Sequence, residues 1–234
     1  MTPTSCFVPL QFGVACLLAG LSGCALQPIA DAATTGTISG TIRVTEKGVA
    51  AKDPSGVVAY LVGFTSPPPK TPAALSQQNH QYVPGLLPAV VGQTVTFPNL
   101  DYDTSHNAFS LDPRFNLGQY RAGRGDPPSH VFDTPGPVEI YCDIHPDMAA
   151  TVLVLPNTSF ATTGSGGTFT LTNVAPGTWG LFAYDRRALA PAHTQVTVTA
   201  GGTATVSLAV DRTRFTFDHK TWEGQEYGTR TYMP

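Results

Sequence analysis

The protein has 234 residues, of which only 12% are charged, and its net charge is -3 at pH 7. So low a charge fraction excludes a coiled coil or a solvated disordered chain, and the acidic balance excludes the basic surface that binds nucleic acid. The 23 glycines and 21 prolines favour short strands joined by turns over long helices. The length allows one large or two small domains, each with its own core.

The N-terminus has the character of a targeting segment. Residues 1–23 carry no charged side chain and include an apolar run, Phe12 to Leu21, that is too short to span a bilayer and is typical of a signal-peptide core. It ends in Leu21-Ser22-Gly23-Cys24, which resembles the lipobox of bacterial lipoproteins. The resemblance implies a signal peptide over 1–23, a lipidated Cys24 and a periplasmic protein anchored to a membrane, for which we expect the outer membrane.

One departure from the lipoprotein pattern leaves an alternative open. The residues before the apolar run include no Lys or Arg, although signal peptides usually begin with a positive charge. In the alternative, the segment is an ordinary secretory signal with a chance match to the lipobox, and the protein is secreted into the periplasm without an anchor.

The four cysteines do not predict two disulfides. Cys6 and Cys16 would leave with the signal peptide, and Cys24 would carry lipid. Cys142 is then the only free thiol of the mature protein. Because the periplasm is oxidising, a lone thiol there needs a group that occupies it.

After a polar tether over 24–35, the chain reads as a series of short strands. Apolar and polar residues alternate, or short apolar runs stand between turn residues, and no segment has a helical period. The expected strands are 36–44, 56–64, 89–97, 138–141, 150–155, 167–171, 180–184, 193–199 and 203–210. The sequence therefore predicts an all-β protein built of sandwiches.

Residues 162–184 resemble the carboxypeptidase regulatory-like sandwich, which is prealbumin-like or immunoglobulin-like. The resemblance rests on the strand Gly167-Thr168-Phe169, the turn Val174-Ala175-Pro176-Gly177 and the aromatic strand that follows. That family opens with G-x-I-x-G-x-V, a form that this chain has at 36–44. We expect 36–65 and 158–211 to build one sandwich, with a domain over 66–157 inserted and a C-terminal tail over 212–234. The alternative is two sandwiches in tandem.

The residues with the clearest chemistry lie in the middle of the chain. Cys142, His145 and Met148 have C-x-x-H-x-x-M spacing, and His106 follows an upstream strand. A thiolate, two imidazoles and a thioether are the ligand set of a blue-copper site, because the soft sulfur stabilises Cu(I) and the imidazoles serve both oxidation states. With three ligands on one short loop, the backbone fixes most of the site, and a change of oxidation state needs little rearrangement.

This pattern resembles the cupredoxin family, in particular its amicyanin-like and plastocyanin-like members and a group of methylamine utilisation proteins. The matching segments, which cover roughly 70–157, are Cys142 to Met148 with Pro146, the strand Val95 to Asn99 followed by His106 and Asn107, and the short motifs 76–79, 98–101 and 115–118. The resemblance implies a Greek-key sandwich with one mononuclear type 1 copper ion. His106, Cys142 and His145 would be equatorial ligands, Met148 the axial ligand, and Asn107 would order the two ligand-bearing loops near the thiolate.

Other chemistries explain the same residues less completely. A catalytic cysteine would leave Met148 and the His106 strand without a role, and zinc gains nothing from a thioether. A binuclear copper site needs a second cysteine where Asp143 and Ile144 stand. A fold that had lost its metal would be expected to have lost a ligand, and all four are present.

The expected function is a membrane-anchored carrier of single electrons between periplasmic redox proteins. We expect a monomer that is not an enzyme and does not bind nucleic acid, with the exposed edge of His145 as the point of electron exit. One alternative is a copper buffer or delivery protein, which would use the same ligands. Another is a sandwich module that binds a partner or glycan, with copper secondary.

Overall fold

The computed structural model describes residues 34–214 and 216–227. In this part of the chain all regular structure is β-strand, so the predicted all-β class is confirmed. We find no helix among these residues with the length and apolarity to cross a membrane. The predicted signal peptide, Cys24 and most of the predicted tether lie outside the described residues.

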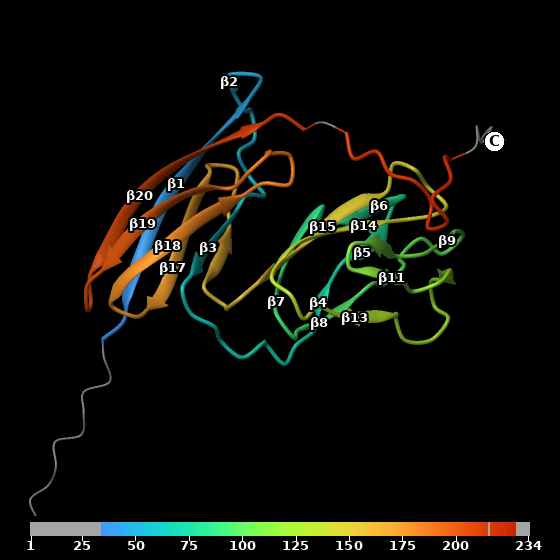
Figure 1. Cartoon of the computed structure of the whole chain (residues 1–234), viewed down its shortest axis with the longest axis horizontal. Helices are drawn as coiled ribbons and strands as arrows, with labels where there is room; N and C mark the ends of the chain where they lie inside the picture. Colours follow the sequence, from blue (N-terminus) through green and yellow to red (C-terminus); the bar gives the residue numbers. More distant parts are fainter. Residues whose placement is uncertain (1–33, 215, 228–234) are drawn as a thin grey trace, which may run out of the picture. The chain divides into compact units, whose positions relative to one another are not determined.

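The first sandwich combines strands from both ends of the described chain. In one sheet β1 (Gly36–Glu46) pairs antiparallel with β17 (Thr168–Val174) and parallel with β20 (Thr203–Arg212), and β2 (Val49–Ala50) pairs with the end of β1. Figure 1 shows β1 in blue beside β20 in red. The second sheet has the order β16 (Phe160–Thr162), β3 (Val58–Val62), β18 (Gly177–Tyr184) and β19 (Ala192–Val198). The core between them contains residues from 38–61 and from 169–210.

Close packing explains one glycine of the opening G-x-I-x-G-x-V pattern. Buried residues alternate along β1, and Ile38 and Ile42 are fully buried in the core. A Cβ at Gly40 would lie 2.6 Å from the ring of Phe169 and 2.8 Å from Val206. Because β1 is flanked by strands on both sides, a side chain at Gly40 would force its neighbours apart.

The second sandwich is built from residues 73–155. One sheet has the order β11 (Arg114–Asn116), β10 (Phe109–Leu111), β14 (Gly136–Tyr141), β15 (Ala149–Leu155) and β7 (Leu86–Val90). Facing strands are β13 (Ser129–Val131), β8 (Thr94–Thr96) and β4 (Ala73–Ala74). Two further pairs are β9 (Ser105–His106) with β12 (Tyr120–Arg121), and β5 (Ser76–Gln78) with β6 (Gln81–Val83).

The core of this second sandwich extends to the predicted metal ligands. The apolar run of β15 is buried from Ala150 to Leu155 because β14 and β7 flank it within the sheet and the core covers it. The same core cluster includes Phe97, Cys142 and Met148. The sulfur-bearing residues are therefore part of a packed interior, and not of a mobile surface loop.

The single strand expected over 89–97 was wrong. β7 ends at Val90 and β8 begins at Thr94, and the two belong to different sheets. Between them Gly92 has a φ of +82°, a left-handed conformation that ends an extended strand. The side-chain oxygen of Gln93 accepts from the Val90 N–H at 3.0 Å and fixes the turn.

Candidate metal centre

The sequence-predicted ligands meet at one end of the second sandwich. His106 is the last residue of β9, and Cys142 follows the last residue of β14. The loop 142–148 carries Cys142, His145 and Met148 and leads directly into β15. The N–H of Met148 donates to the carbonyl of His145 at 3.0 Å, which closes the loop into a turn. We call residues 142–148 the ligand loop.

Three of the four side chains converge on one point. His106 Nδ1 lies 3.1 Å from His145 Nδ1, and Cys142 Sγ lies 3.8 Å from His145 Nδ1. The donor atoms of these three residues all lie within 4.8 Å of one another. Met148 is fully buried in the same core cluster as Cys142. A thiol and two imidazole nitrogens at this spacing fit a copper ion, since their lone pairs can share one small cation.

Burial distinguishes the three converging residues. Cys142 and His106 are wholly inaccessible to solvent, whereas His145 keeps 7% of its surface exposed. Solvent or a metal ion therefore reaches this cluster most directly at His145. This cluster is also the one group of His, Cys, Asp and Glu side chains in the described chain whose donor atoms lie close enough together to hold a metal.

Asp101 fixes the orientation of His106, a role that the sequence reasoning missed. The Asp101 carboxylate accepts from His106 Nε2–H at 2.9 Å, which leaves the Nδ1 lone pair facing His145 and Cys142. The same carboxylate accepts from the backbone N–H groups of Asn79 and His80 at 2.7 and 3.0 Å. Burial acts to raise the pKa of Asp101, but these three hydrogen bonds outweigh it and lower the pKa. Asp101 therefore stays ionised at neutral pH.

Substitution of Asp101 by Asn should weaken metal binding. The neutral asparagine amide lacks the negative charge with which the Asp101 carboxylate holds the His106 ring. The loss of such a partner typically costs about 10–100-fold in metal affinity. We expect a Cu(II) dissociation constant higher by that factor in a competition titration. Asp103→Asn is the matched control, because Asp103 is exposed and hydrogen-bonds to Thr104. Equal affinities for the two variants would show that Asp101 does not orient a ligand.

Two opposing effects in the surroundings of Cys142 act on the pKa of its thiol. Burial raises the pKa of the Cys142 thiol. Hydrogen bonds from the backbone N–H groups of Asn107, Ile144 and His145 act in the opposite direction. The thiol is therefore protonated at neutral pH, and a metal ion must displace its proton on binding. The N–H groups then stabilise the thiolate charge.

Asn107 joins the two segments that carry the ligands. Its side-chain oxygen accepts from the Asp143 N–H at 2.7 Å, and its amide nitrogen donates to the Asp143 carboxylate at 3.1 Å. Its backbone carbonyl accepts from Tyr82 OH at 2.7 Å and Gln77 Nε2 at 3.0 Å. The bonds to Tyr82 and Gln77 are buried and those to Asp143 are partly buried, and together they hold the His106 segment against the start of the ligand loop.

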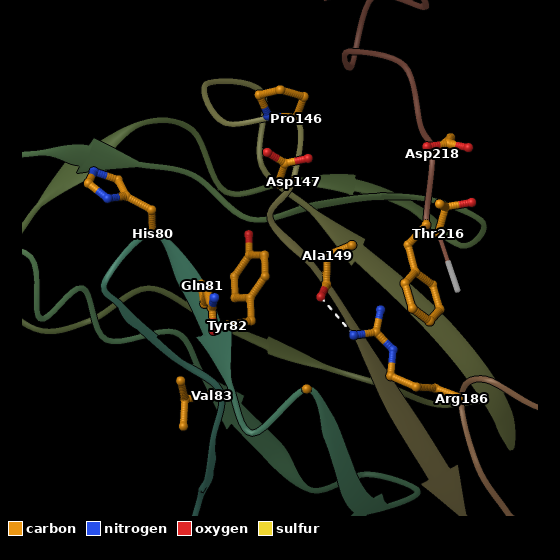
Figure 2. Close-up of a pocket in the computed structure, with 12 residues that line it drawn as sticks. His80, Gln81, Tyr82, Val83, Pro146, Asp147, Ala149, Arg186, Thr216 and Asp218 are labelled. Carbon is orange, nitrogen blue, oxygen red and sulfur yellow. Dashed lines mark hydrogen bonds between the residues drawn. The ribbon is translucent and has the colours of Figure 1, made fainter. Parts of the chain in front are cut away.

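His80 and Trp222, to which the sequence gave us no reason to assign a role, both lie near this site. The His80 ring centroid is 4.7 Å from that of His145 and 5.7 Å from that of His106, and His80 is exposed. The Trp222 N–H donates to the Asp143 carboxylate at 2.6 Å. Figure 2 shows the pocket beside the ligand loop, with His80 on the side of β6 and Asp147 on the loop. Residues as far along the chain as Asp218 line this pocket, and its charged lining residues are Asp147, Arg186 and Asp218.

Comparisons with known proteins give separate similarities for the two sandwiches. A family model described as polysaccharide lyase family 4, domain II, matches residues 157–206. The chain is similar to a novel purple cupredoxin from Nitrosopumilus maritimus, with 29% sequence identity over 36% of this chain and 99% of that chain and a TM-score of 0.31. It is similar to amicyanin from Paracoccus versutus, with 19% identity over 40% of this chain and 96% of that chain and a TM-score of 0.33. It is also similar to a Cu-containing nitrite reductase from Thermus scotoductus SA-01, with 26% identity over 40% of this chain and 24% of that chain and a TM-score of 0.34. The match therefore spans about a quarter of the nitrite reductase.

No curated protein matches this chain. The relationships to the carboxypeptidase regulatory-like family, to the methylamine utilisation group and to lipoproteins stay predictions from the sequence.

Proposed function

We propose that this protein carries single electrons by means of one type 1 copper ion held by His106, Cys142, His145 and Met148. The observation that carries the proposal is a buried cluster of one thiol and two imidazole groups at the end of a packed sandwich core. The donor atoms of these three side chains all lie within 4.8 Å of one another. Thiolate and imidazole together suit copper, and a buried thioether beside them suits copper better than zinc. Bound copper would supply a one-electron couple between Cu(I) and Cu(II).

The contribution of the chain to this function is rigidity. Asp101 holds His106, Asn107 holds Asp143 next to Cys142, and the core surrounds Cys142 and Met148. Donor atoms fixed in this way move little when the charge at the site changes, which keeps electron transfer fast. His145, with its exposed edge, is the proposed exit for the electron.

The proposed setting follows from the sequence. We propose a periplasmic protein, anchored to a membrane through lipid on Cys24, that acts as a monomer with periplasmic redox proteins as partners and is not an enzyme. Asp147 lies in the ligand loop beside the exit and would favour partners whose docking surface is basic.

Copper buffering or delivery is the second candidate function. It is favoured by the exposed His80, whose ring lies 4.7 Å from that of His145 and offers a further imidazole on the solvent side. Imidazole binds both Cu(I) and Cu(II), so His80 could receive or release the ion at the mouth of the site.

Copper titration with voltammetry tests the proposal and separates the two candidates. One equivalent of Cu(II) per chain should produce the intense blue charge-transfer band of a copper thiolate. An electron carrier should then cycle reversibly at an electrode and lose copper slowly to a chelator. Rapid exchange of copper without reversible cycling would favour copper handling, and a chain that takes up no copper would exclude both functions.

A further inference from the structure

The segment after β20, described at residues 213–214 and 216–227, leaves the first sandwich and extends across the second. After β20 the N–H groups of Thr213 and Arg214 donate to the carbonyl of Arg187 at 3.0 and 2.8 Å. The Arg214 guanidinium pairs with Glu139 of β14 at 3.5 Å. Both the Arg186 and the Arg214 guanidinium groups lie over the Phe217 ring, 3.6 and 4.3 Å from its centroid. These contacts fix the direction in which the segment continues.

The second half of this segment contacts three consecutive residues, the last residue of β14 and the first two of the ligand loop. The His219 ring stacks on Tyr141, with centroids 4.2 Å apart and planes 14° apart. Tyr227 OH donates to the carbonyl of Cys142 at 2.7 Å and lies 2.8 Å from His219 Nε2. The Trp222 N–H donates to Asp143 Oδ1 at 2.6 Å. Each of residues 141–143 therefore has its own contact with this segment.

Trp222 is itself held in place on the second sandwich. The Arg114 guanidinium lies 3.9 Å above the Trp222 ring and donates to its carbonyl at 3.3 Å. The ring also meets Phe109 edge-on, with centroids 6.1 Å apart. The cation–π contact with Arg114 and the aromatic pair with Phe109 both act to keep Trp222 on the second sandwich.

Asp143 connects this segment to the interior of the site. One of its carboxylate oxygens accepts from Trp222 and the other from Asn107, while its N–H donates to Asn107. The peptide that joins Cys142 to Asp143 is thus held at its carbonyl by Tyr227 and at its N–H by Asn107. The orientation of that peptide sets the direction in which the Cys142 side chain leaves the backbone.

At its other end the ligand loop is held by the first sandwich. Arg186, which follows β18, donates to the carbonyl of Ala149 at 2.9 Å, the bond drawn as a dashed line in Figure 2. The loop is therefore held at both ends by residues from outside the second sandwich.

We infer that the segment described at residues 213–214 and 216–227 forms a strap over the proposed copper centre, and that Tyr227 and Trp222 are positioning residues for Cys142. This inference rests on the proposed function where it concerns copper. Its mechanical part, that the strap restrains the peptide bearing the Cys142 thiol, is independent of any metal. A loosened strap should make Cys142 more reactive in the metal-free protein, and should speed the loss of copper and shift the reduction potential in the loaded one.

Tyr227→Phe tests the strap by removing one hydroxyl group and keeping the ring. Tyr102→Phe is the matched control, because Tyr102 is 79% exposed. In metal-free protein we expect Cys142 to be alkylated about tenfold faster in Tyr227→Phe than in wild type or in the control. The alkylation rate is measured on the peptide that contains Cys142. In loaded protein, loss of copper to a chelator should accelerate by about 10-fold, the lower end of what such supporting partners contribute.

Trp222→Ala provides a second variant that acts through a different contact. It removes the ring from Arg114 and Phe109 but keeps the backbone N–H that reaches Asp143. As for Tyr227→Phe, we expect faster alkylation of Cys142 in the metal-free protein and faster loss of copper in the loaded one. If both variants match wild type in alkylation, the strap inference is overturned. If wild type takes up no copper while the variants still expose Cys142, the strap stands and the proposed function fails.

Discussion

Replacing Cys142 with serine should abolish the blue band and lower Cu(II) affinity by more than about 100-fold, beyond the usual effect of losing a partner of a ligand. The hydroxyl group is a hard, weakly acidic donor, so it supplies neither the charge-transfer band nor a stabilising ligand for Cu(I). The measurement is an optical titration with Cu(II), with His130→Gln as control, since the described metal-ligating cluster does not include His130.

The fold should survive this change, which makes the result interpretable. The backbone N–H groups of Asn107, Ile144 and His145 that hydrogen-bond to the sulfur can donate to a serine oxygen instead. We therefore expect metal-free Cys142→Ser and metal-free wild type to unfold at nearly the same temperature. A blue band that persists in Cys142→Ser would show that another residue supplies the sulfur and would contradict the proposed site.

The part of the site that lies on one loop could be predicted from the sequence because its geometry is local. Cys142, His145 and Met148 are separated by two residues each, so any compact turn brings them together. His106 could be added because of the motif that it shares with cupredoxins. Asp101 appeared only as part of a short motif, and the bond to His106 that defines its role depends on how the chain turns between β8 and β9.

The rest of the site depends on contacts between distant segments, which the alternation of apolar and polar residues along the sequence cannot reveal. His80 reaches His145 because the turn between β5 and β6 is held by Asp101. Tyr227 reaches Cys142 across 85 positions of sequence, from a segment with no period and no strand among its described residues. Aromatic residues in such a segment are typical of both a packed strap and an uninformative tail, and only the structure distinguishes them.

The fold shows the same division between local and distant information. Alternation predicts that residues 36–44 form a strand, but it does not identify the neighbours of that strand. In the structure β1 lies between β17 and β20, which come from the far side of the second sandwich in sequence. The pairing has a physical basis in Gly40, where the absent side chain makes room for Phe169 and Val206.

The first sandwich has a buried charge network at the point where the strap begins. Arg212, the last residue of β20, donates to Asp185 at 2.7 Å and to the carbonyls of Asp53 and Ser55, both at 2.8 Å. Asp185 and Arg212 are only 4% and 8% exposed. Removal of the cation would leave the buried Asp185 carboxylate without its paired charge and two carbonyls without their donor, a loss that typically costs about 3–5 kcal/mol.

Arg212→Ala should therefore lower the unfolding temperature strongly. At about 2–4 °C per kcal/mol for a chain of this size, the expected decrease is roughly 6–20 °C, measured by calorimetry or circular dichroism. Arg187→Ala is the control, because Arg187 pairs with Glu46 at 3.0 Å but is 31% exposed, and an exposed pair contributes less than about 1 kcal/mol. Equal decreases for the two variants would contradict the importance of burial in this network.

The same variant shows how far the two sandwiches depend on each other. Thr213 and Arg214 are the next residues after Arg212, so an opened first sandwich removes the anchor of the strap at Arg187. The stacking of the strap on Tyr141 and its hydrogen bonds to Cys142 and Asp143 remain possible. If Cys142 becomes reactive at the temperature at which the first sandwich unfolds, the strap transmits the stability of one sandwich to the other. If Cys142 stays protected to a higher temperature, the contacts of His219, Trp222 and Tyr227 hold the strap by themselves, because the anchor at Arg187 is then already lost.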